Sequence, residues 1–177
     1  MNFEAAQENM KDAYYGGSTG VFASGLVWCL AGIVAIFSSQ YNSMLTLFFG
    51  GMFIHPLGML FSKILKRAGN HHSDNPLGKS ALENTIIIFV GLFLAFSISQ
   101  SHIEWFYPIM LMIIGARYMT FQTLYGLKIY WLLGAILMMS GVGGILLNTS
   151  FIVGAFVGGG LEVIFSFIIL RQSSNRK

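Results

Sequence analysis

Six apolar stretches, each roughly 20 residues long, restrict what this chain can fold into more than any other feature. They cover residues 17–38, 42–64, 82–100, 105–124, 129–147 and 150–170. A helix needs about 20 apolar residues to cross the hydrocarbon core of a bilayer. The sequence therefore predicts an all-α integral membrane protein, with six transmembrane helices forming a single domain over residues 1–177.

The composition excludes most soluble classes of protein. Hydrophobic residues make up 55% of the chain and charged residues only 10%, whereas about a quarter of an ordinary soluble domain is charged. A transmembrane β-strand would alternate polar and apolar residues, but residues 86–90 read IIIFV with no polar residue. Helices are therefore predicted, and too little chain remains for a soluble enzyme or nucleic-acid-binding domain.

The distribution of positive charge predicts which ends of the helices face the cytoplasm. Nine of the ten lysines and arginines lie before the first stretch, around the second and fourth connections, or after the last stretch. The connections at 38–43, 99–106 and 147–151 contain none. Positively charged short loops are retained on the cytoplasmic side. We therefore expect three helical hairpins with both termini cytoplasmic, and the short loops suggest a bacterial inner (plasma) membrane.

The two ends of the chain are expected to lie outside the membrane. Residues 1–15 predict a cytoplasmic amphipathic helix along the membrane surface, because apolar residues recur there at helical spacing. Their acidic character differs from the basic start of a signal peptide, so the first span should stay attached. Residues 171–177 are predicted to form a cytoplasmic tail.

Three ionisable residues, His55, Arg117 and Glu162, occupy similar depths in the even-numbered spans. Each lies 12 or 13 residues beyond the preceding outer turn, which is roughly 18–20 Å along a helix. A charge at the centre of a span costs at least about 2.5–3.5 kcal/mol, so such groups are expected to turn inward. If an axis along the membrane normal relates the hairpins, the three residues meet near it. We predict that they bind a ligand or a proton.

Different interpretations of this polar layer stay open. In a small transporter or channel-like protein, Arg117 would bind an anionic group, Glu162 would balance its charge, and His55 would exchange protons near neutral pH. In a structural or stress-related membrane protein without a ligand, Arg117 and Glu162 would form an internal ion pair. An intramembrane enzyme with Glu162 or His55 as general base is less supported, because no hydrolase motif is present.

Three further residues are candidates for an inner gate or a cavity lining. Glu83 and Asn84 open the third span, where a carboxylate either favours the helix start or pairs with Arg117. Trp28 lies in the middle of the first span, where it packs in the core or lines a cavity. Pro56, next to His55, is expected to bend its helix.

Small and polar residues form one stripe on each of two spans. Stripes of this kind bring helices into close contact or line a narrow cavity, and they also suit a contact between two copies of the chain. The stripes consist of Gly51, His55, Gly58 and Ser62, and of Gly154, Gly158, Glu162 and Ser166.

The sequence predicts no cofactor, no metal site and no nucleic-acid partner. Cys29 is the only cysteine and lies in an apolar span. His71, His72 and Asp74 share one loop but are a weak metal signal. The expected partners are the lipid bilayer, a small-molecule ligand, and a second copy of the chain bound through the glycine-rich helix faces. No motif identifies a known family.

Overall fold

A computed structural model describes residues 1–174 and contains helices as its only regular elements in that range. The prediction of an all-α fold is confirmed. Residues 175–177 of the predicted tail lie outside the described part, and residues 171–174 belong to the last helix. The elements are α1 (Phe3–Tyr14), η1 (Tyr15–Gly17), α2 (Ser18–Phe37), α3 (Gln40–Ile64), α4 (Leu77–Ser99), η2 (Ile103–Trp105), α5 (Phe106–Tyr125), α6 (Ile129–Leu146) and α7 (Phe151–Ser174).

Local signals explain where these helices begin and end. The Ser39 hydroxyl accepts a hydrogen bond from the backbone N–H of Asn42 (3.1 Å), which caps the start of α3. At the end of α5, Gly126 adopts a left-handed conformation (φ 68°) and donates its N–H to the carbonyl of Gln122. A side chain there would be strained, and glycine avoids that cost.

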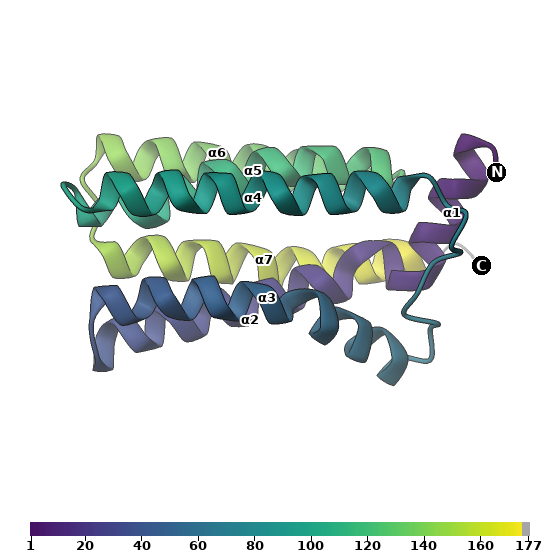
Figure 1. The fold of residues 1–177 in the computed structure, drawn as a ribbon, viewed down its shortest axis with the longest axis horizontal. Coiled ribbons are helices and arrows are strands. Elements are labelled where there is room, and N and C mark those ends of the chain that lie inside the picture. The colour runs from purple at the N-terminus through teal and green to yellow at the C-terminus, as the bar shows by residue number, and fades with distance from the viewer. Residues whose placement is uncertain (175–177) are drawn as a thin grey trace.

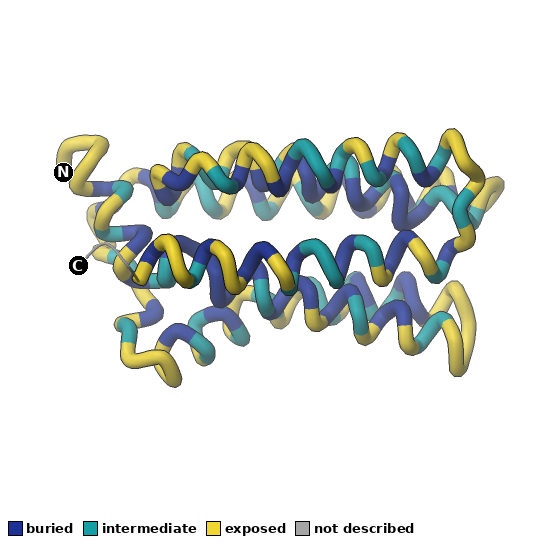
Figure 2. The backbone as a smooth tube through the Cα atoms, turned by 180° about the vertical axis from the view of Figure 1, so that it is seen from behind, coloured by how far each residue is buried: buried dark blue, intermediate teal, exposed yellow. Residues whose placement is uncertain are grey.

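Five of the helices are long and apolar enough to cross a membrane, by length and composition. The first is the continuous helical stretch Phe3–Phe37, which comprises α1, η1 and α2, and the other four are α3, α4, α6 and α7. Helix α5 has 20 residues but also carries Arg117 and Gln122. Exposed positions run along the length of the helices (Figure 2), and many hold large apolar side chains, such as Phe37 (85% exposed) and Phe93 (70%). Lipid would cover such a surface, so we describe the chain as a membrane protein.

The helices form two groups (Figure 1). Helix α2 packs most extensively on α3 and α7, whereas α5 packs on α6 and, less extensively, on α4. Helix α7 also contacts α5 and α6, and so joins the two groups. The consecutive helices α2 and α3 pack on each other, as do α4 and α5, whereas α6 and α7 are consecutive but belong mainly to different groups. The start of α1 and the end of α7 lie at the same end of the bundle (Figure 1).

Glycines explain which helices pair most closely. A Cβ added to Gly25 on α2 would lie 3.0 Å from the carbonyl oxygen of Gly159 on α7, and the reverse distance is also 3.0 Å. Gly115 on α5 and Gly134 on α6 form a similar reciprocal contact. Small residues allow two helix backbones to approach in this way. The glycine contacts therefore specify the α2–α7 and α5–α6 pairs.

Helix α1 covers the end of the bundle at which α7 ends (Figure 1). Its apolar residues Ala6, Met10 and Ala13 are buried, at most 4% exposed. The amide of Asn75 donates to the Ala6 carbonyl (2.9 Å), and Gly69 N–H donates to the Ala13 carbonyl (3.1 Å). The apolar face of α1 therefore packs on the protein, whereas the sequence suggested that it lies on the membrane surface. Its periodicity showed an apolar face but not which surface covers that face.

Candidate functional site

Glu162 is an ionisable side chain with no exposed surface in the middle of the bundle. It lies on α7 one turn after Gly158, where an added Cβ would collide with the ring of Trp28 on α2. Trp28 itself is 1% exposed. The glycines of α7 thus let α2 approach closely enough to enclose the carboxyl group. The stripe with Gly154, Gly158 and Glu162 is a contact between helices of the same chain.

Within residues 1–174, one oxygen of the Glu162 carboxyl group has a hydrogen-bond partner. Tyr118 on α5 donates its hydroxyl to Oε1 at 2.7 Å, and Ser24 on α2 lies beside the same group. Oε2 is buried and accepts no hydrogen bond from residues 1–174. A buried charge is expensive unless it is paired and hydrogen-bonded. The carboxyl group therefore needs either a bound proton or a compensating cation.

Arg117 lies next to Tyr118 in sequence but faces another direction. Its guanidinium carbon lies 5.0 Å from the ring centroid of Phe121, and its buried Nε has no hydrogen-bond partner within residues 1–174. Consecutive side chains point about 100° apart around a helix, so Tyr118 and Arg117 cannot both face Glu162. Among the described ion pairs within 4.0 Å, none joins Arg117 to Glu162.

His55 does not join the other two residues. It is exposed, and its ring centroid lies 6.5 Å from that of Tyr14 on α1. Helix α3 lies at the edge of the bundle and packs mainly on α2, so only part of the predicted stripe is covered. Ser62 is buried and hydrogen-bonds Thr19 of α2 at 2.8 Å. The expected meeting of all three ionisable residues is therefore not observed.

The candidate gate and lining residues have different surroundings. Asn84 is 9% exposed and accepts a hydrogen bond from Thr120 (3.1 Å), which ties α4 to α5. Glu83 is exposed and forms none of the described ion pairs. Trp28 packs in the core, 5.4 Å from the ring of Tyr107, and its buried Nε1 donates to no acceptor in residues 1–174.

Sequence reasoning missed the residues that contact Glu162 most directly, Tyr118 and Ser24. Tyr118 could have been found, because it lies in the middle of a span rather than at a membrane interface, where tyrosines concentrate. It is 3% exposed and stacks with Tyr130 at 5.9 Å. Ser24 gave no comparable signal, since serines are common on packed membrane helices.

No metal centre accompanies this site in residues 1–174, where no group of three or more His, Cys, Asp and Glu side chains is gathered. The fold and the site define a class: an all-helical membrane protein with one enclosed carboxyl group at the contact of α2, α5 and α7. A family model described as a family of unknown function, DUF7010, matches residues 3–172, and the chain belongs to that family. No curated protein and no solved structure matches the chain.

Proposed function

We propose that the chain is a small transporter or channel-like membrane protein, in which Glu162 binds and releases a proton and Arg117 attracts a small anion. The observation that carries this proposal is the pair of unsatisfied groups: Oε2 of Glu162 and Nε of Arg117 are both buried without a partner in residues 1–174. Intramembrane ionisable groups are expensive, and those that remain unpaired are candidate functional groups.

The geometry favours this function over an internal ion-pair lock. A lock requires a direct contact between guanidinium and carboxylate, because only then does their attraction offset the cost of burying both charges. The Glu162 carboxyl group has a Tyr118 hydroxyl as its partner instead. A hydroxyl can donate a hydrogen bond to the carboxyl group whether that group is protonated or ionised, which suits a group that must exchange its proton.

The same proposal includes an orientation and a location. We place both termini and α1 in the cytoplasm of a bacterium, with the bundle in the inner membrane, because the ends of the helices near the termini carry most of the basic residues. His55 then lies beside Tyr14 of the cytoplasmic helix α1.

A double-mutant cycle tests the choice between site and lock. Arg117→Met, Glu162→Gln and the double variant are unfolded thermally in detergent. We expect each single variant to lie within about 1 kcal/mol of the parent or to be more stable, with a coupling below about 1 kcal/mol. A lock would make each single variant about 3–5 kcal/mol less stable, and the double variant would recover most of that loss.

A further inference from the structure

A second polar site, which does not include Glu162, lies where α3 ends beside α1. It is a pocket of about 430 Å³ whose polar lining includes Asn9, Asp12, Lys66, Arg67, His71 and His72. We call it the α1–α3 pocket. Its walls come from α1 and from the segment that follows α3. This segment is held against α1 by the hydrogen bond from the His72 N–H to Asn9 (3.0 Å).

The lining of the α1–α3 pocket has a net positive charge. Lys66 and Arg67 supply two cationic groups, and Asp12 is the acidic residue of the lining. Burial lowers the pKa of His71, and the nearby His55 lowers it further, so the His71 imidazole is neutral at neutral pH. Its Nδ1 lies 3.0 Å from the Tyr14 hydroxyl. The positive charge of the pocket therefore comes from Lys66 and Arg67.

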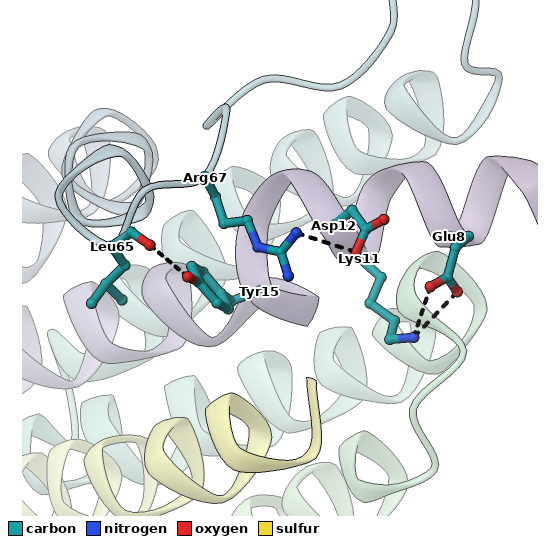
Figure 3. Close-up of polar contacts among 6 residues, drawn as sticks. All are labelled: Glu8, Lys11, Asp12, Tyr15, Leu65 and Arg67. Atoms are coloured by element: carbon teal, nitrogen blue, oxygen red, sulfur yellow. Dashed lines mark hydrogen bonds and ion pairs between the residues drawn. The ribbon is translucent and has the colours of Figure 1, made fainter. Parts of the chain in front are cut away.

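The Arg67 side chain is already held in place (Figure 3). Its Nη1 lies 3.6 Å from Oδ1 of Asp12, and its guanidinium carbon lies 4.8 Å from the ring centroid of Tyr15. Tyr15 in turn donates its hydroxyl to the carbonyl of Leu65. A guanidinium that is fixed before binding loses little side-chain freedom, and its planar fork of donors matches the oxygens of a phosphate group.

An apolar surface adjoins these cationic groups. Leu60, Ile64 and Leu65, at the end of α3, are 51%, 64% and 41% exposed. Helix α3 is one of the helices with the length and composition to cross a membrane, so its end lies at the level of the lipid headgroups. A ligand that fits both surfaces has an anionic head and an apolar tail.

We propose that the α1–α3 pocket binds the phosphate group of an anionic membrane phospholipid, with its acyl chains along the exposed end of α3. Lys66 and Arg67 contact the phosphate oxygens. A soluble phosphate ester shares this headgroup chemistry, but it would leave the apolar surface beside the pocket unused. Anionic lipids are also attracted to basic segments beside transmembrane helices.

Native mass spectrometry of the full chain in detergent tests this proposal. Phosphatidylglycerol and phosphatidylcholine with identical acyl chains are titrated against the protein. We expect phosphatidylglycerol to bind more tightly than phosphatidylcholine. The double variant with Lys66→Gln and Arg67→Gln should bind phosphatidylglycerol about 25-fold more weakly, at about fivefold for each charge. The control is Lys128→Gln, which removes an exposed charge outside the pocket before α6 and should change binding by less than about twofold.

Asp12→Asn should strengthen lipid binding rather than weaken it, so its effect cannot be mistaken for a loss caused by misfolding. It removes the negative charge beside Arg67, so phosphatidylglycerol should bind about fivefold more tightly. An equal loss per charge removed in the Lys66→Gln/Arg67→Gln double variant and in Lys128→Gln would overturn the proposal, because it would indicate a general surface-charge effect. Complete displacement of the lipid by millimolar glycerol 3-phosphate would also overturn it, in favour of a site for soluble phosphate esters.

Discussion

Gly159→Ala should destabilise the protein by about 1–3 kcal/mol, the usual range for overpacking a tight contact. The new methyl group would lie 2.6 Å from Sγ of Cys29 and 3.0 Å from the carbonyl oxygen of Gly25. The second of these atoms belongs to the α2 backbone, which cannot move without separating α2 from α7. This cost exceeds the gain of about 1 kcal/mol in helix propensity that alanine offers over glycine.

The adjacent residue supplies the control. Apart from its chain neighbours and the backbone of its own helix, no atom of residues 1–174 lies within 4 Å of a Cβ added to Gly160. Gly160→Ala should therefore leave stability unchanged or raise it by up to about 1 kcal/mol. Thermal unfolding of both variants in detergent measures the difference. Equal stability of the two variants would contradict the close α2–α7 contact.

Glu162→Gln should reduce proton flux through the reconstituted protein by at least about tenfold, because an amide cannot carry the proton. The glutamine oxygen still accepts from Tyr118, so packing is kept. The measurement uses liposomes that contain a pH-sensitive dye, with a potential imposed by a potassium gradient and valinomycin. Tyr118→Phe removes the 2.7 Å hydrogen bond but not the carboxyl group, and should reduce the flux less.

Glu4→Gln is the matched control for this flux, since Glu4 is an exposed carboxylate in the first turn of α1. It should leave the flux at the parental level. If Glu162→Gln carries protons as fast as Glu4→Gln, or if the parent does not exceed protein-free liposomes, Glu162 is not a proton-carrying group and the proposed function fails.

The helices were readable from the sequence because long apolar stretches and polar interruptions act locally. Six helices lie at the six apolar ranges, although α4 begins earlier and α7 ends later than expected. The sequence does not predict in the same way which helices pack on each other. The choice of α7 rather than α6 as the partner of α2 depends on Gly25 and Gly159 meeting across the bundle, and glycines occur in all six spans.

The candidate site was predictable in part. Depth along the chain singled out Glu162, and its complete burial agrees with the expectation that a charge at that depth turns inward. Depth does not give the direction in which a side chain points. Counting along the spans gave His55 a comparable depth, but it lies beside Tyr14 on an edge helix and is exposed, and Arg117 is directed toward Phe121. Rotation of each helix about its axis depends on packing partners distant in the sequence.

The central claim is that Glu162 exchanges a proton inside the membrane, and infrared difference spectroscopy after a pH jump tests it most directly. The parent and Glu162→Gln are compared in lipid, and the absorption of protonated carboxyl groups is followed. We predict a carboxyl band that changes with the pH jump in the parent and is missing in Glu162→Gln. An identical difference spectrum in both proteins would contradict the claim.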